Sequence, residues 1–156
     1  MITCTFENGK SAALRHVVVH AIVERDGALL LVRRAPHLSE GGKWGLPGGF
    51  LDRGERLVDG VLRELLEETG WRGEVRQLFR INSRPDRPRE DRQNVAVEFV
   101  ITPLERVGTP DHESTAVEWI AIDRLPDLDA LAFDHGETIR LYLAARDRPP
   151  RTPILE

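Results

Sequence analysis

Three glutamates in the middle of the chain, Glu64, Glu67 and Glu68, stand at positions i, i+3 and i+4. On an α-helix these spacings place the carboxylates on one face, where like charges repel one another at neutral pH. A divalent cation removes that repulsion, and carboxylates without clustered histidine or cysteine prefer hard cations. The cluster therefore predicts a site for Mg²⁺ or Mn²⁺ and not for zinc. A helix with a solvated acidic face is the alternative interpretation.

A helix from Arg56 to Thr69 is the element that must position these acids. Apolar residues at i, i+3, i+4 and i+7 can be buried on a different face: Val58, Val61, Leu62 and Leu65. Arg63 can pair with Glu67 one turn further on and with Glu64 beside it, which leaves other carboxylate oxygens for a metal ion. Gly70 is expected to end the helix, because glycine accepts the left-handed conformation common after a last turn.

The stretch from Gly49 to Trp71 matches a longer pattern of glycines, acids and one arginine. The fixed positions of the pattern are, in chain order, Gly49, Glu55, Arg63, Glu64, Glu67, Glu68 and Gly70. With this spacing the stretch resembles the signature of the Nudix hydrolases, which cut nucleoside diphosphates linked to another group. Trp71 departs from the family's pattern, in which the closing residue is usually aliphatic. Because the glycines and the arginine have no role in a merely solvated helix, the match favours a metal site.

The resemblance implies a set of metal ligands. They are the backbone carbonyl of Gly49 or its neighbour Gly48, Glu55 as an outer ligand or through water, and Glu64, Glu67 and Glu68. Arg63 is expected to orient the acids. Family members often carry a further acid in a loop before a strand, and Glu113 is matched to it; Asp111 competes, and a surface acid is the alternative. The base that takes a proton from water is Glu64 or Glu113.

Arginines and aromatic residues near the signature are candidates for substrate contacts. They are Arg33, Arg34, Trp44, Phe50, Arg84, Arg87 and Arg89. Guanidinium groups match phosphate oxygens in a two-pronged geometry, and an aromatic ring can stack on a base. The alternatives are a solvated strand end, a solvated loop and aromatic packing in the core. His16 and His20 are expected to pack or hydrogen-bond rather than to catalyse, because neither has a second histidine at ligand spacing.

The order of the expected elements indicates the fold. The expected strands are 14–23, 28–33 after a turn at Asp26-Gly27, 75–81, 95–101 and 117–122. Asp134 and Glu137 have the form of a capping box that opens a last helix, to about Arg146. This order predicts a mixed sheet packed between helices, and the resemblance implies an α/β/α sandwich. The expected domain is single, 1–156, with an N-terminal arm or edge strand at 1–12 and a tail at 147–156.

The composition suits one soluble globular domain, since 156 residues include 40% hydrophobic and 31% charged residues. A formal net charge of −4 gives no general attraction to nucleic acid. Cys4 is the only cysteine, which excludes an intrachain disulfide and fits a reduced, cytoplasmic setting. Neither a secretory signal nor a membrane-spanning run is evident in the sequence.

The resemblance implies a Mg²⁺- or Mn²⁺-dependent hydrolase with a small nucleotide as its partner, and no membrane or nucleic acid. The stretches 84–101 and 131–135 resemble the branch that includes ADP-ribose pyrophosphatases, so ADP-ribose is the first expected substrate. Nucleoside triphosphates, including oxidised ones, and dinucleoside polyphosphates are alternatives. A silent module that binds nucleotide sugars is an alternative of another class. Many relatives are homodimers, but the sequence leaves the oligomeric state open.

Overall fold

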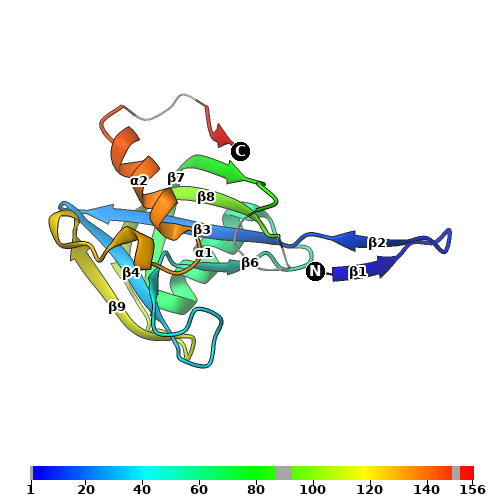
Figure 1. The fold of residues 1–156 in the computed structure, drawn as a ribbon. Coiled ribbons are helices and arrows are strands. Elements are labelled where there is room, and N and C mark those ends of the chain that lie inside the picture. The colour runs from blue at the N-terminus through cyan, green and yellow to red at the C-terminus, as the bar shows by residue number, and fades with distance from the viewer. Residues whose placement is uncertain (1, 87–92, 149–151) are drawn as a thin grey trace.

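The computed structural model of the protein describes residues 2–86, 93–148 and 152–156. A mixed sheet lies between two α-helices, α1 (Leu57–Thr69) and α2 (His135–Ala145) (Figure 1). On one face, Val61 and Leu65 of α1 pack in a core with β-strand side chains. On the other, Ile139 of α2 packs in a second core. The predicted sandwich of a mixed sheet between helices is confirmed.

Eight strands form this sheet. They are β3 (Val17–Arg25), β4 (Ala28–Arg34), β5 (Trp44–Gly45), β6 (Gly48–Phe50), β7 (Trp71–Asn82), β8 (Val95–Arg106), β9 (Ser114–Ala121) and β10 (Ile154–Leu155). The strand β3 pairs in parallel with β8 and in antiparallel with β6, whereas β4 pairs with β5 and β9. The strands β3 and β4 pair only beside their turn, at Glu24–Arg25 and Ala28–Leu29. Beyond the turn they diverge, which leaves space between β6 and β4 where a site can form.

The helix α1 begins one residue later than predicted, because Arg56 has extended backbone angles and acts as the N-cap. Gly70 ends the helix at φ 74°, as predicted, and a Cβ at this position would lie 2.2 Å from the carbonyl oxygen of Gly108. Val61 and Leu65 are fully buried, but Val58 is exposed. The predicted apolar stripe is therefore wrong at Val58, and in the first turn Leu57 packs against the core instead.

The predicted capping box at the start of α2 does not form. The side chain of Asp134 makes no capping hydrogen bond and instead accepts one from Asn82 Nδ2 at 3.2 Å. The Glu137 carboxylate accepts a hydrogen bond from Arg84 Nη1 at 3.0 Å. Both acids are therefore engaged with β7 and the segment after it, because contacts across the fold compete with local capping.

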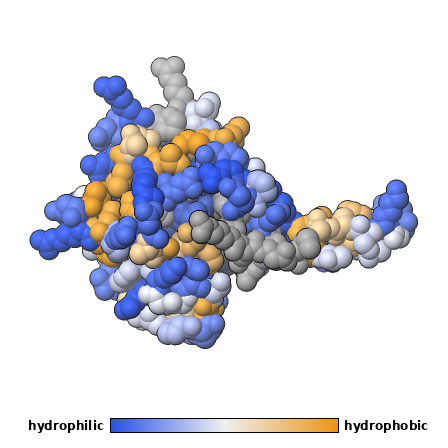
Figure 2. Space-filling model, viewed as in Figure 1, coloured by the Kyte–Doolittle hydropathy of each residue, from blue (hydrophilic) through white to orange (hydrophobic). Residues whose placement is uncertain are grey.

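The first residues form a separate hairpin, β1 (Ile2–Thr5) and β2 (Ser11–Leu14), which projects from the body of the molecule (Figure 1). The predicted strand 14–23 consequently starts at Val17, since Leu14 belongs to the hairpin. Hydrophobic side chains are exposed on this projection (Figure 2): Ile2, Phe6 and Leu14.

The residues predicted as a C-terminal tail include β10, which pairs in parallel with β7 at Arg80 and Ile81. The two short 3₁₀ helices, Ile122–Arg124 and Leu128–Ala130, lie between β9 and α2. Across the described parts of the chain, no helix has the length and apolar character that crossing a bilayer requires.

Candidate active site

Arg63 is the centre of an ion-pair network made by the signature residues. Its Nε donates to Glu55 Oε1 at 2.8 Å, and its Nη1 donates to Glu64 Oε1 at 2.8 Å and to Glu67 Oε2 at 3.0 Å. Its Nη2 donates to the carbonyl oxygen of Phe50 at 3.1 Å. The hydrogen bonding of Glu55 with Arg63 lowers the pKa of the Glu55 carboxyl below its usual value. The arginine thus ties the loop before α1, the helix and β6 to one another.

Glu68 lies deeper than the other acids and has only 3% of its surface exposed. Its Oε2 accepts a hydrogen bond from the backbone N–H of Gly48 at 2.8 Å. The pKa of Glu68 is raised to about 8, chiefly by burial; the hydrogen bond from Gly48 opposes this rise, and the negative charges of Glu64 and Asp111 add to it. Burial also raises the pKa of Glu64, although Arg63 opposes this. Glu64 and Glu68 therefore hold their protons more tightly than ordinary glutamates do.

Gly48 and Gly49 bring the backbone of β6 against these carboxylates. A Cβ at Gly48 would lie 2.1 Å from the carbonyl oxygen of Val19, and a Cβ at Gly49 would lie 2.6 Å from Glu64 Oε1. Only glycine allows so close an approach, because any side chain would displace a neighbouring strand or a carboxylate.

The loop before β9 brings two more acids to the cluster. The backbone N–H of Asp111 donates to the carbonyl oxygen of Glu67 at 2.9 Å, which fixes the loop at the end of α1. Asp111 Oδ1 accepts from the backbone N–H of Glu113 at 2.9 Å, and the carbonyl oxygen of Glu113 accepts from Ala35 at 2.8 Å. Asp111 therefore holds the loop, while the side chain of Glu113 faces the adjoining cavity.

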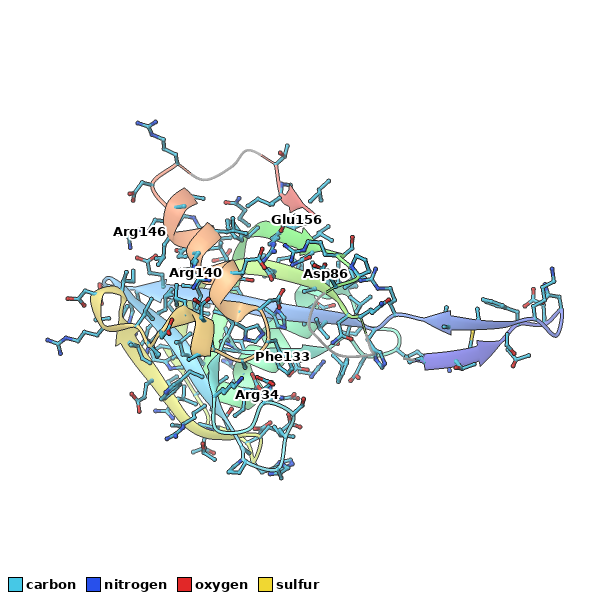
Figure 3. All side chains as sticks on the ribbon, viewed as in Figure 1. Arg34, Asp86, Phe133, Arg140, Arg146 and Glu156 are labelled. Carbon is cyan, nitrogen blue, oxygen red and sulfur yellow. The ribbon has the colours of Figure 1, made fainter. Side chains whose placement is uncertain are left out.

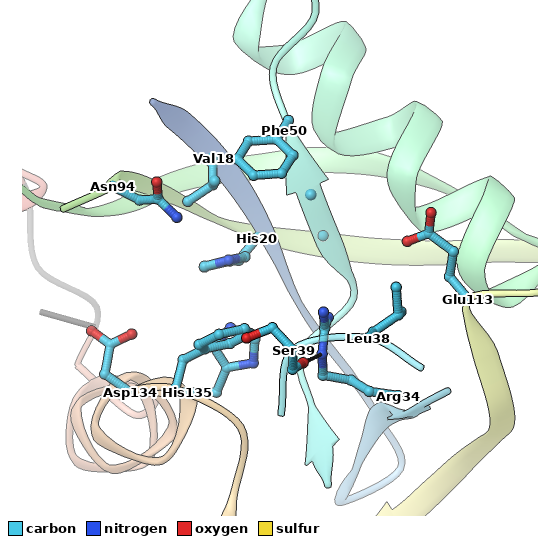
Figure 4. Close-up of a pocket in the computed structure, with 13 residues that line it drawn as sticks. Val18, His20, Arg34, Leu38, Ser39, Phe50, Asn94, Glu113, Asp134 and His135 are labelled. Carbon is cyan, nitrogen blue, oxygen red and sulfur yellow. Dashed lines mark hydrogen bonds between the residues drawn. The ribbon is translucent and has the colours of Figure 1, made fainter. Parts of the chain in front are cut away.

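A cavity of about 260 Å³ opens beside the acidic cluster, between β3, β6 and the start of α2 (Figure 4). Four of the predicted site residues line it: Arg34, Gly49, Phe50 and Glu113. In Figure 4 Glu113 lies at one side of this space and Asp134 at the other, with His20 between them. The Arg34 guanidinium also lies 5.1 Å from the ring centroid of Phe133, which belongs to the same wall (Figure 3).

The other predicted substrate contacts lie outside this cavity. Arg33 Nε donates to the carbonyl oxygen of Gly42 at 3.0 Å, and Trp44 packs against the core under α2. Arg84 pairs with Glu137 and Asp86, and it lines a second, wider depression of about 840 Å³. This depression shares Phe133 and Asp134 with the first cavity. Arg87 and Arg89 lie outside the described residues.

His20, which was expected to pack, and Asp134, which was expected to cap a helix, also line the cavity, together with Asn94 and His135, for which the sequence predicted no role of their own. His20 interrupts an apolar run in β3, and Glu98 interrupts another in β8. A polar residue inside an otherwise apolar strand could have marked these positions as functional, but the strand pattern does not reveal which cavity such a residue lines.

The residues fit a hard divalent cation by their chemistry, because all the donors are carboxylate or backbone oxygens. Within residues 2–86, 93–148 and 152–156, however, no three acidic, histidine or cysteine side chains form a group that could hold a metal ion as they stand. The reason is Arg63, which engages Glu64 and Glu67 while Glu68 bonds to Gly48.

Raising the pH is expected to destabilise the metal-free protein. Because the pKa of Glu68 is raised from 4.5 to about 8, the folded state holds its proton more tightly than the unfolded chain does. Its contribution to stability is complete below pH 4.5 and is lost as the pH rises to about 8. The loss is on the order of 5 kcal/mol. Thermal unfolding in a chelator from pH 5 to 9 measures this, with Glu68→Gln as the variant that lacks the effect. A pH-independent difference between the two proteins would contradict the prediction.

Comparison with known proteins identifies one family. The model of the NUDIX domain matches residues 14–142. An ADP-ribose pyrophosphatase of Methanocaldococcus jannaschii is 33% identical over 128 residues, which cover 81% of this chain and 72% of the relative.

Solved structures agree in fold. A NUDIX hydrolase from Nitrosomonas europaea superposes with a TM-score of 0.78 at 27% identity, covering 99% of this chain and 90% of that one. An ADP-ribose pyrophosphatase from Streptococcus suis superposes with a TM-score of 0.75 at 23% identity, covering 92% of this chain and all of the other. With the signature residues gathered around Arg63, these matches show that the chain belongs to the Nudix family and is a hydrolase of pyrophosphate bonds.

Proposed function

We propose that this Nudix hydrolase cleaves the diphosphate linkage of a nucleoside diphosphate derivative in the presence of Mg²⁺ or Mn²⁺. ADP-ribose is the first candidate, with AMP and ribose 5-phosphate as products. The observation that carries the proposal is a cavity of about 260 Å³ beside the acidic cluster, lined by Gly48 and Gly49, which lie against Glu68 and Glu64. A cavity near the lower end of the roughly 300–1,000 Å³ usual for ligand sites suits one nucleoside beside a metal-bridged diphosphate. The Methanocaldococcus relative supports the choice of substrate.

Glu64, Glu67 and Glu68 would hold the metal, with Glu55 in an outer position and the carbonyl oxygen of Gly49 as a further ligand. Family members generally use divalent metal ions. When bound, such an ion neutralises charge on the diphosphate and lowers the pKa of water. Glu64 and Glu67 must turn away from Arg63 to join Glu68, since Arg63 now bonds to both. Arg63 keeps its bonds to Glu55 and Phe50 in that case and remains fixed.

The remaining residues act on the water and on the substrate. Glu64 or Glu113 takes the proton from the attacking water, since Glu64 has a raised pKa and Glu113 faces the cavity. Arg34 also lines the cavity, and its guanidinium can bind two phosphate oxygens of the substrate. Phe50 offers an aromatic face to the base.

A substrate panel at fixed Mg²⁺ tests this proposal. It comprises ADP-ribose, other nucleoside diphosphate sugars, dinucleoside polyphosphates and nucleoside triphosphates, with products separated by chromatography. AMP together with ribose 5-phosphate supports the proposal. If a nucleoside triphosphate is instead hydrolysed faster than ADP-ribose, giving a monophosphate and pyrophosphate, triphosphate hydrolysis would replace the proposed activity. Tight binding of ADP-ribose without turnover in Mg²⁺ or Mn²⁺ would favour a silent binding module.

Gly49→Ala is expected to lower kcat/KM by about a hundredfold with little loss of stability. The added Cβ would lie 2.6 Å from Glu64 Oε1, and this flexible carboxylate would move aside at small cost to folding. A displaced ligand weakens metal binding, as is typical when support around a metal site is lost. Activity as a function of Mg²⁺ concentration measures the effect.

Gly108→Ala is the matched control for Gly49→Ala, because a Cβ there makes only an ordinary contact of 3.5 Å. It is expected to keep both activity and the Mg²⁺ dependence of the natural protein. If Gly49→Ala kept full activity as well, Gly49 would not support the metal site.

A further inference from the structure

A row of polar side chains crosses the face of the sheet that α2 covers. His20 on β3, Glu98 on β8 and Arg80 on β7 are neighbours across the strands, because the strand register pairs Glu98 with both of the others. Glu98 and Arg80 are fully buried, and His20 has 8% of its surface exposed. The rest of this face is an apolar core that includes Ile22 and Phe79. Charges buried in such a core are costly unless they are paired, so packing alone does not explain the row.

The row is held in place by α2. Arg80 Nη1 donates to Thr138 Oγ1 at 3.0 Å, and the Thr138 hydroxyl donates to Glu98 Oε1 at 2.8 Å. Arg80 also binds the Glu156 carboxylate, with Nε at 2.7 Å from Oε2. Glu98 Oε1 in turn lies 4.0 Å from Nδ1 of His20. The carboxylate of Glu98 is therefore fixed beside one nitrogen of the His20 ring.

The exposed edge of His20 lies on the floor of the cavity (Figure 4). Its strand neighbour across β3 and β6 is Gly48, whose N–H binds Glu68. On its other side the ring meets His135, with ring centroids 4.5 Å apart. Along the cavity floor the order is thus acidic cluster, Gly48, His20 and His135. A nucleotide with its phosphates at the acids would place its sugar at His20, since the sugar directly follows the phosphates.

We propose that His20 is a specificity-determining residue that hydrogen-bonds a ribose hydroxyl of the bound nucleoside. Glu98 is a positioning residue, which orients the imidazole from the side of Nδ1 as a carboxylate commonly does for a working histidine. The inference rests on the proposed function, because that function places the phosphates of the nucleotide at the acidic cluster and so its sugar at His20. A sugar hydroxyl both donates and accepts hydrogen bonds, so it can bond a ring nitrogen of His20 whether or not that nitrogen carries a proton.

Calorimetric binding of AMP, 2′-deoxy-AMP and 3′-deoxy-AMP in Mg²⁺ tests the proposal. The natural protein is expected to bind AMP about tenfold more tightly than at least one deoxy analogue, as for one well-made hydrogen bond. His20→Phe keeps an aromatic ring against His135 but removes both nitrogens, and it is expected to bind the three ligands equally. Glu98→Gln is expected to reduce the preference in part.

Tyr142→Phe is the matched control. It removes the hydrogen bond of 2.7 Å from Tyr142 to Glu24, which also joins α2 to β3 but does not line the cavity. It is expected to retain the full preference for AMP. Thermal unfolding shows which variants are folded, and His20→Leu, which also lacks a hydrogen-bonding group, replaces His20→Phe if the latter does not fold.

A preference that survives in the folded His20 variant would overturn the proposal. Equal binding of the three ligands by the natural protein, or no binding of AMP at all, would also overturn it. Because binding needs no turnover, a preference that depends on His20 would stand even if ADP-ribose were not hydrolysed. Conversely, hydrolysis of ADP-ribose without a preference for the ribose hydroxyls would remove only the role of His20.

Discussion

Replacing Glu68 with glutamine is expected to lower kcat/KM by about 10³-fold, since a metal ligand supports several kcal/mol of charge stabilisation in the transition state. Glutamine keeps the shape of the side chain and can still accept the hydrogen bond from the Gly48 N–H. The change therefore removes charge and leaves the backbone in place. Because Glu68 is buried and carries a raised pKa, the same substitution should stabilise the metal-free protein above neutral pH.

The combination of lost activity and gained stability distinguishes a metal ligand from a structural residue. Asp59→Asn on the same helix is the control, because Asp59 is paired with Arg56 in an exposed position away from the acidic cluster. It should leave kcat/KM unchanged. A loss of less than about tenfold in Glu68→Gln would remove Glu68 from the metal site.

Arg80→Leu is expected to lower the free energy of unfolding by about 3–5 kcal/mol, because one partner of a buried charge pair is lost while Glu98 remains buried. The guanidinium also binds Thr138 and the Glu156 carboxylate, so its loss loosens α2 and β10 together. At roughly 2–4 °C per kcal/mol, Tm should fall by about 10 °C. Denaturant unfolding measures the change.

Arg72→Leu on the same strand is the control for this variant. Its ion pair with Glu105 spans 3.5 Å and is largely exposed, so the expected change is less than about 0.5 kcal/mol. Equal losses in the two variants would mean that the buried row contributes nothing specific to stability.

Local spacing was enough to predict the helix that carries the acids. Arg63 reaches Glu67 because neighbours at i+4 lie within reach on any helix, whatever surrounds it. Gly70 ends that helix for an equally local reason, the left-handed backbone conformation it adopts at φ 74°.

Local patterns failed where a distant element competed. Asp134 and Glu137 have the spacing of a capping box, but Asn82 and Arg84 bind them instead. Val58 has the spacing of the buried stripe, yet it is exposed, and Leu57 of the same turn packs against the core with the strands. In each case the partner comes from another part of the chain, which no local pattern contains.

The sequence by itself determined the family, the acidic helix and the glycines that meet it, because these depend on residues within one short stretch. Only the tertiary structure decided which residues from other parts of the chain lie near the acidic helix and these glycines. It brought Arg34 and Glu113 to the cavity through the separation of β4 from β3, and it aligned His20 with Glu98 through a parallel pairing of distant strands. Strand pairing joins residues far apart in the chain, and alternation along one strand does not reveal the register of the next.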